Sequence, residues 1–300
     1  MFNFKNITIG LLAFIAALFG GSKAYIDHQI QQKLNGFSQS SGKNIQLNYS
    51  NANLSWTGQL VIEKVKLDTE NQPSITIEKL VLHQAYLFYD MKNSLPEQSH
   101  IELFGVQIDV PDVASEAPVI LSSYKPYYLS LSELRQLGFP QFAMDIDIKA
   151  KQMTENLDIL INVQGQRWAN LTVAATLLNL PASPLDWLKQ ADQIQLEQFI
   201  LTYDEQDLLQ KTMTFLAHRN QQPENIFKQQ LGYKLRRDIE MLRSQLEMSS
   251  IDSLVQFVQQ PKQLQFIFQP KPPFPAYQTI INTPPQNLIQ HLGFKIKYMP

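Results

Sequence analysis

The chain contains no cysteine in its 300 residues. Disulfide bonds, thiolate metal sites and a cysteine nucleophile are therefore excluded. Charged side chains are also scarce, at 17% of the residues, whereas about a quarter is usual. The formal net charge is −2. The chain thus has no overall attraction for polyanions, and we expect no nucleic-acid partner.

Hydrophobic residues make up 44% of the chain and aromatic residues 10%, which is enough to bury a core. Without covalent cross-links that core must supply the stability of the protein, which is reasonable at this length. Changes in the residue pattern predict three regions. These are a membrane anchor with an exit helix (1–38), a β-rich region (39–126) and an α+β region (127–300).

The longest apolar run covers residues 7–26, and Lys23 is its only charged residue. A helix of about 20 residues is roughly 30 Å long and just spans a bilayer. Lys23 lies near the end of the run, where a lysine can extend its ammonium group to the interface. We therefore predict a single membrane-spanning helix that places the remaining chain on the far side of the membrane.

A cleaved signal peptide is the alternative for the same segment. Ser22 and Ala24 are small residues at the spacing that signal peptidase requires for cleavage after Ala24. However, the apolar residues Ile26, Ile30 and Leu34 continue at one per helical turn beyond that point. This continuation favours an uncleaved anchor that leads into an exit helix.

From residue 45 onward, apolar residues alternate with polar ones, which is typical of antiparallel strands with one solvated face. In the strand at 60–67, Val61 and Val65 share one face with Leu67. A one-residue slip between Ile77 and Leu80 indicates a bulge. Two groups of strands are expected: 45–49, 60–67, 75–82, 86–89 and 101–110, then 144–148, 157–163, 171–178 and 194–203.

Helical spacing dominates after residue 204. The strongest pattern is an amphipathic helix of six turns over 227–246, whose basic side chains form a solvated face. A capping box of Ser130 and Glu133 begins an earlier short helix that ends at Gly138. Further helices are expected at 184–189, 209–216, 250–259 and 286–291, strands at 264–268 and 294–298, and irregular or extended segments at 111–126 and 270–275. The predicted fold class is α+β: an N-terminal membrane helix, antiparallel β-meanders forming a curved sheet, and C-terminal helices packed on it.

The first 110 residues resemble a known group of envelope proteins. The pattern joins Gly21 and Tyr25, at the end of the apolar run, with the segments "IQLNYSNANLSWTGQLVIEKVKL" and "SITIEKLVL". This is similar to the opening of AsmA-like and YdgA-like proteins, which are anchored in the inner membrane of Gram-negative bacteria. The positions that carry the resemblance are Gly58, Val65, Leu67, Ile75, Ile77, Leu80 and Leu82.

The resemblance implies a single-pass protein of the bacterial inner membrane with its body in the periplasm. AsmA-like proteins are thought to carry lipid in the apolar trough of a curved sheet. On this reading, the strand positions that face lipid or form the core are Val65, Leu67, Ile75, Ile77, Leu80, Leu82 and Phe88. The expected partners are the membrane, through residues 7–26, and phospholipid or other envelope proteins.

Three function hypotheses follow. The first is a non-catalytic envelope protein that handles lipid or supports outer-envelope assembly. The second is a structural adaptor with a sealed core and a protein-binding edge strand. The third is an envelope hydrolase whose catalytic residues are dispersed in sequence. An open apolar groove would favour the first hypothesis, and a perturbed carboxylate or histidine in a cleft would favour the third.

Two short motifs are compatible with catalysis but have simpler explanations. Asp145 and Asp147 form a D-x-D of the kind that binds metal–nucleotide in some glycosyltransferases, yet on a strand both point to the solvated face. Ser122 and Lys125 have the S-x-x-K spacing of penicillin-recognising enzymes, but Pro126 biases Lys125 away from a helix. We expect neither to act in catalysis.

The five histidines, His28, His83, His100, His218 and His291, are scattered along the chain. None belongs to an H-x-H or H-E-x-x-H motif, so their spacing predicts no metal site, although residues far apart in sequence can still meet in space. Phosphate-binding and nucleophile-elbow motifs are also absent. We therefore predict no catalytic residue, no cofactor and no metal.

Overall fold

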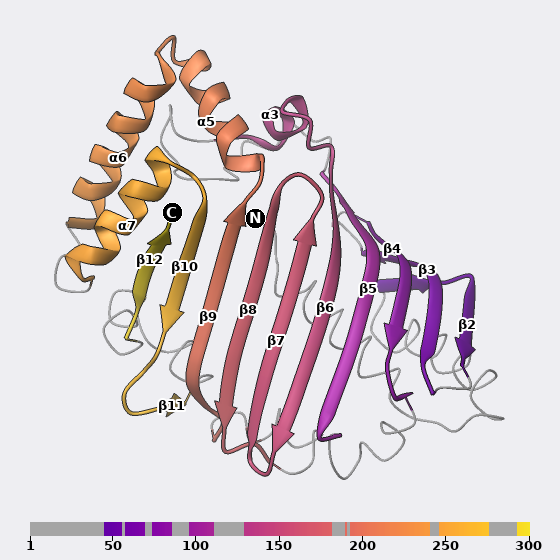
Figure 1. Cartoon of the computed structure of the whole chain (residues 1–300). Coiled ribbons are helices and arrows are strands. Elements are labelled where there is room, and N and C mark those ends of the chain that lie inside the picture. Colours follow the sequence, from indigo (N-terminus) through magenta and orange to yellow (C-terminus); the bar gives the residue numbers. More distant parts are fainter. Residues whose placement is uncertain are drawn as a thin grey trace.

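The strands form one antiparallel sheet in the computed structural model (Figure 1). The structure describes residues 45–55, 58–69, 74–85, 96–110, 129–181, 190, 193–240, 246–275 and 293–300. The strand order is β1-β3-β4-β5-β6-β7-β8-β9-β10-β12, with β2 also paired to β3 and β11 to β9. The bounds are β1 Ile45–Asn48, β2 Asn51–Leu54, β3 Leu60–Thr69, β4 Ile75–Leu82, β5 Gln98–Asp109, β6 Gln141–Met153, β7 Asn156–Gly165, β8 Ala169–Leu178, β9 Gln195–Glu205, β10 Gln263–Phe268, β11 Phe274–Pro275 and β12 Lys295–Met299.

Several predicted elements lie outside the described residues: the anchor and exit helix, the strand at 86–89 with Phe88, the segment 111–126, and the helices at 184–189 and 286–291. Among the helices that the structure does describe, none has the length and apolar character needed to cross a membrane. The predicted division at residue 126 falls between β5 and β6, which are paired neighbours in the sheet. That pairing joins the two predicted strand groups into a single sheet.

The register gives the sheet two distinct faces between β5 and β10, because side chains of paired residues point to the same side. We call the side that carries Asp147 the polar face and the side that carries Ile148 the apolar face. One row of the polar face is Glu102, Asp147, Asn162, Thr172, Thr202 and Gln265. The adjacent row of the apolar face is Ile101, Ile148, Ile161, Val173, Leu201 and Phe266.

One cross-strand row is irregular: it contains Lys64 of β3, Glu78 of β4 and Gly105 of β5. Lys64 has φ 52° and Gly105 has φ 59°, both in the left-handed region. Between them, Glu78 and Lys79 are both exposed, so buried residues resume one position later on β4. The predicted one-residue slip between Ile77 and Leu80 is thus confirmed. The bulge inferred from it is wrong for β4, because β4 keeps one register with β3 and with β5 through these residues. The register shift instead lies between β5 and β6, at Leu103 and Val106.

At this row the observed burial pattern of β3 differs from the predicted one. Leu60 and Ile62 are buried before Lys64, whereas Val65 and Leu67 are buried after it. Val61 therefore faces the opposite side from the core, and its predicted grouping with Val65 is wrong. The left-handed conformation of Lys64 shifts the alternation by one residue, and a lysine at that position gives no warning of it in the sequence.

Gly105 offers a direct test of this row. A Cβ at residue 105 would lie 2.6 Å from Cγ of Glu78, in addition to the positive φ. We expect Gly105→Ala to lower the free energy of unfolding by about 1–2 kcal/mol. Urea denaturation followed by circular dichroism measures it. Gly138→Ala is the control, because Gly138 also has a positive φ but nothing within 4 Å of its Cβ position. Unchanged stability in Gly105→Ala would contradict this account.

Of the helices that the structure describes, α7 packs against β10 and β12, α6 against α7 and α5 against α6, whereas α3 lies at the upper end of β6 (Figure 1). Their bounds are α3 Leu131–Gln136, α5 Leu208–Arg219, α6 Glu224–Glu240 and α7 Met248–Gln259. The predicted capping box at Ser130 and Glu133 is confirmed. Glu133 also forms an ion pair of 2.5 Å with Arg219, which ties α3 to α5.

The buried residues form two clusters. The sheet cluster contains Leu60, Ile62, Val65, Leu67, Ile75, Ile77, Leu80, Leu82, Ile101, Leu103, Val106 and Met144. The helix cluster gathers residues of α3, α5, α6, α7, β10 and β12 around Leu134, Met213, Leu216 and Phe227. Phe142 and Trp168 pack against both clusters and so join them.

Candidate functional site

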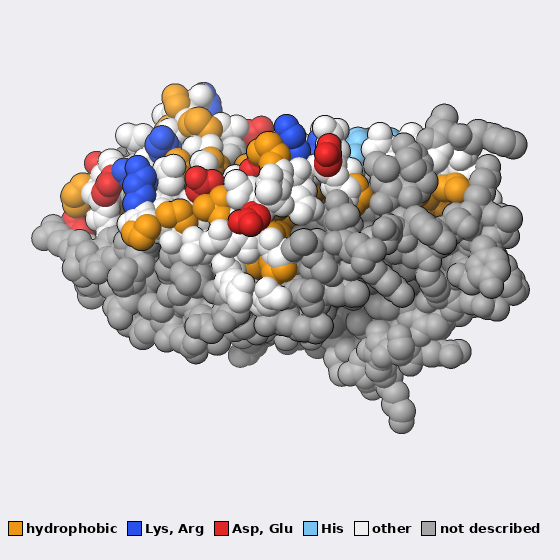
Figure 2. All heavy atoms as spheres, turned by 90° about the horizontal axis from the view of Figure 1, so that it is seen from below, with side chains coloured by type: hydrophobic (Ala, Val, Ile, Leu, Met, Phe, Trp, Pro, Cys, Tyr) orange, Lys and Arg blue, Asp and Glu red, His pale blue; other side chains and the backbone are white. Residues whose placement is uncertain are grey.

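A groove of about 740 Å³ crosses β5 to β9 on the polar face. One cross-strand row runs along it, formed by His100, Lys149, Leu160, Ala174 and Ile200. Basic and imidazole groups thus lie at one end of this row and aliphatic groups at the other. Figure 2, which views the molecule from the lower end of Figure 1, shows histidine side chains at the surface close to basic ones.

The next row of the groove is polar throughout. It consists of Gln98, Lys151, Asp158, Thr176 and Gln198. The Thr176 hydroxyl donates to the Asp158 carboxylate at 2.8 Å. In contrast, Leu160 is 37% exposed, which is unusual for a leucine in the middle of a sheet. The groove can therefore contact a ligand through both polar and aliphatic groups.

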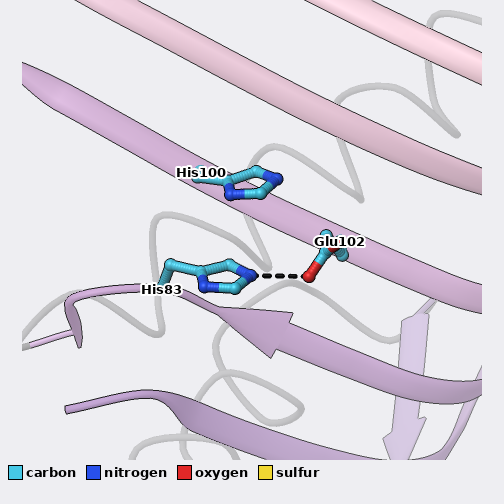
Figure 3. Close-up of side chains that lie close together, drawn as sticks. All are labelled: His83, His100 and Glu102. Atoms are coloured by element: carbon cyan, nitrogen blue, oxygen red, sulfur yellow. Dashed lines mark hydrogen bonds and ion pairs between the residues drawn. The ribbon is translucent and has the colours of Figure 1, made fainter. Parts of the chain in front are cut away.

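His83 and His100 stack against each other at the β5 end of the groove (Figure 3). Their ring centroids lie 4.2 Å apart and the rings are parallel within 8°. Nε2 of His83 lies 2.6 Å from a carboxylate oxygen of Glu102, and its Nδ1 lies 3.1 Å from the amide nitrogen of Gln59. His83, His100 and Glu102 each place one potential metal-ligand atom within 4.8 Å of the others.

Asp147 pairs with the second ring, that of His100. Its carboxylate lies 2.8 Å from Nε2 of His100 and 3.1 Å from Nζ of Lys149. Burial alone raises the pKa of Asp147, but hydrogen bonds from His100 and Lys149 and their charges outweigh burial, so the net pKa lies below the usual value. Asp147 is therefore an anion at neutral pH.

The predicted strand positions lie in the interior. Val65, Leu67, Ile75, Ile77, Leu80 and Leu82 are all buried and belong to the sheet cluster. Phe88 lies outside the described residues. These six positions therefore form core in this structure, and half-buried apolar residues occur farther along the sheet.

An apolar strip covers the middle of the apolar face, over β6 to β9. Each of its members is half-buried, whereas the strands β3 to β5 on one side carry fully buried residues. The strip joins three cross-strand rows without a charged residue. It consists of Ile146, Ile148, Ile159, Ile161, Val163, Leu171, Val173, Ala175, Phe199 and Leu201.

The placement of Asp145 and Asp147 on the polar face agrees with the sequence analysis. Asp145 accepts a hydrogen bond of 2.7 Å from the backbone N–H of Gly105.

The pair formed by His83 and His100, by contrast, was not expected from the spacing of the histidines in the sequence. The pair could have been predicted only from the register of β4 with β5, because the pairing of Leu82 with Ile101 places His83 opposite His100.

Comparison with known proteins gives one family match. Residues 139–298, more than half of the chain, match a family described as "Uncharacterized protein". A search of curated proteins finds no match. The matched residues include β6 to β11, all but the last residue of β12, and the apolar strip. They also include Lys149 of the groove and its partner Asp147, but not His83, His100 or Glu102. The chain belongs to this family of uncharacterized proteins.

Proposed function

We propose that this protein is a non-catalytic, membrane-anchored envelope protein that binds lipid acyl chains on its apolar strip. The observation that supports the proposal is the strip itself: apolar side chains that are neither fully buried nor interrupted by charge across four strands. Scattered exposed apolar residues are ordinary on protein surfaces. A continuous apolar area is instead typical of a binding surface.

The chemistry of the strip favours lipid over a polar ligand. Strands lie about 4.8 Å apart, so β6 to β9 span about 14 Å across the sheet. The strip offers no charged group over that width, and branched aliphatic groups such as Ile161 and Val173 can contact only apolar atoms. Each methylene that an acyl chain transfers from water to the strip contributes about 0.8 kcal/mol.

The sequence of residues 7–26 supports the proposed location. A helix of that length would anchor the protein in the bacterial inner membrane, with the folded body in the periplasm. The resemblance of the first 110 residues to AsmA-like and YdgA-like proteins points to the same compartment. An anchor of this kind would keep the apolar strip near a supply of phospholipid.

Val173 and Thr172 allow a matched test, because they are neighbours on β8 that point to opposite faces. We expect full-length protein extracted in mild detergent to retain phospholipid, measured by mass spectrometry. A lysine in contact with acyl chains costs about 2.5–3.5 kcal/mol, so Val173→Lys should retain at least roughly 10-fold less phospholipid. Thr172→Lys should retain the normal amount.

A photo-crosslinking residue at position 173 should likewise label phospholipid, and one at position 172 should not. Equal labelling from both faces would contradict the proposal, as would protein extracted without bound lipid. Circular dichroism of each variant checks that the sheet is intact. This check separates loss of binding from loss of fold.

The adaptor hypothesis depends on an edge strand that accepts a partner. Within the described residues, β12 pairs with β10 on one side only. It is short and carries Lys295 and Lys297, and lysines on an edge strand discourage pairing with another chain. We therefore prefer lipid binding to docking at the β12 edge.

A further inference from the structure

We propose that His83, His100 and Glu102 form a binding site for a divalent transition-metal ion such as Zn²⁺. This site lies on the polar face and is independent of lipid binding on the apolar strip. The first argument is convergence: three side chains place potential ligand atoms within 4.8 Å of one another. They come from two paired strands, since His83 follows β4 directly and the other two residues lie two apart on β5.

The second argument is orientation. Both Nε2 atoms point to the side on which Glu102 lies (Figure 3). Each contacts a carboxylate, at 2.6 Å for His83 with Glu102 and 2.8 Å for His100 with Asp147. A carboxylate only accepts, so each Nε2 carries the proton it donates. A metal ion would replace these protons, and both carboxylates would remain beside it.

The surrounding residues resemble the supports of known metal sites, in which the second nitrogen of a ligating histidine is held by a polar group. Gln59 occupies this position at Nδ1 of His83, with its amide nitrogen 3.1 Å away. On binding, the Gln59 amide would present its oxygen to an Nδ1–H instead. His83 would then be fixed for coordination through Nε2.

The local charge also favours a cation. Glu102 and Asp147 contribute two negative charges, and Lys149, whose ammonium lies 3.1 Å from Asp147, contributes one positive charge. Metal binding requires both imidazoles to be neutral, and in that state the group has a net charge of −1. A divalent cation bound here would be attracted by this net negative charge.

The stacked rings require one movement. Because the two rings are parallel, their Nε2 atoms point in the same direction and do not converge on one point. One ring must therefore tilt before both Nε2 atoms can bind the same ion. The side chains of His83 and His100 are 25% and 30% exposed, and both rings border the groove. The groove therefore provides space for the tilt and leaves a further coordination position for water.

The donor set selects the class of metal. Imidazole nitrogens suit zinc, copper, nickel and cobalt, whereas calcium and magnesium prefer oxygen ligands alone. Two histidines with a carboxylate are also a known set for zinc. We therefore expect Zn²⁺ and Co²⁺ to bind, and Ca²⁺ and Mg²⁺ not to compete at equal concentration.

The test uses full-length protein in detergent, purified with a tag that contains no histidine and treated with a chelator. Titration with ZnCl₂ in a calorimeter should show saturable binding of one ion per chain, and Co²⁺ should give visible absorption bands. His83→Gln and His100→Gln should each weaken zinc binding by more than about 10-fold, and Glu102→Gln by about 10-fold.

His218→Gln is the matched control, because His218 is an exposed histidine on α5, outside the proposed site. It should bind zinc as the unmodified protein does. Circular dichroism and urea denaturation without metal show whether each variant is folded. Added zinc should raise the midpoint of unfolding in the unmodified protein but not in folded His100→Gln protein. Absence of saturable zinc binding, or equal affinity in all four variants, would overturn the proposal.

Discussion

Trp168→Ala should lower the free energy of unfolding by about 3 kcal/mol, near the low end of the range for deleting a large aromatic side chain. The reason is the position of Trp168 between the sheet cluster and the helix cluster, both of which it contacts. Its ring meets Phe142 edge to face with centroids 5.4 Å apart. Its Nε1–H donates a hydrogen bond of 2.9 Å to the backbone oxygen of Ala143.

Gly165 shows how closely this tryptophan fits. A Cβ at residue 165 would lie 2.4 Å from the Trp168 ring and 2.2 Å from the backbone oxygen of Ala169. The backbone oxygen of Trp168 also accepts from the N–H of Leu208 at 3.3 Å, where α5 begins. This backbone hydrogen bond remains possible in Trp168→Ala, but the loss of the ring that packs against the helix cluster should loosen the attachment of α5 to the sheet.

Trp168→Phe is the control for the tryptophan prediction. It keeps an aromatic ring but removes the hydrogen bond to Ala143, so we expect a loss of about 1–1.5 kcal/mol. Urea denaturation followed by circular dichroism at 222 nm and at 195 nm measures both variants. A loss below 1 kcal/mol in Trp168→Ala would show that the two clusters are joined by other contacts.

The regular elements were predictable because alternation and helical spacing are local signals. The strand expected at 171–178 is Ala169–Leu178, and the helix expected at 250–259 is Met248–Gln259. The capping box at Ser130 and Glu133 specifies a helix start by local hydrogen bonds alone. Each of these depends on residues close together in the chain.

The features that were missed depend on long-range pairing. The junction between β5 and β6 joins strands separated by residues 110–140, and no local pattern specifies that register. The histidine pair has the same cause, since only the pairing of β4 with β5 brings His83 beside His100. Lys64 adds a backbone conformation that most side chains avoid. Such a position is not visible in a hydrophobic pattern.

Glu205 is the second residue whose replacement should have a large effect. It lies at the end of β9 and is half-buried against the start of α5. Its Oε1 accepts from the backbone N–H groups of Leu209 at 2.6 Å and Gln210 at 3.1 Å. The Tyr203 hydroxyl donates to its other oxygen. Asp207 stands at the N-cap of α5 but makes no capping hydrogen bond, so Glu205 caps this helix from the neighbouring strand.

Glu205→Ala should therefore lower the free energy of unfolding by about 2–3 kcal/mol, from the lost cap and the half-buried Tyr203 hydroxyl left without its acceptor. Glu205→Gln is close to isosteric, and its amide oxygen can still accept from Leu209 and Gln210. We expect the glutamine variant to lie within about 1 kcal/mol of the unmodified protein. Urea denaturation at pH 7 compares the two variants directly.

The pH dependence gives a sharper test of Glu205. Burial raises the pKa of its carboxyl group, and the hydrogen bonds from Tyr203, Gln210 and Leu209 offset only part of that rise. A raised folded-state pKa means that proton binding stabilises the fold below the unfolded pKa of about 4.3. That stabilisation is lost as the pH rises through the folded pKa.

The unmodified protein should therefore lose stability relative to Glu205→Gln as the pH rises from about 4 to 8, because glutamine cannot ionise. Glu133, Asp147 and Glu224 have lowered pKa values and shift stability in the opposite direction. They are present in both proteins and cancel in the difference. A stability difference that is constant over this pH range would show that the carboxylate is solvated, and that the cap of α5 is exposed to water rather than held between β9 and the helix.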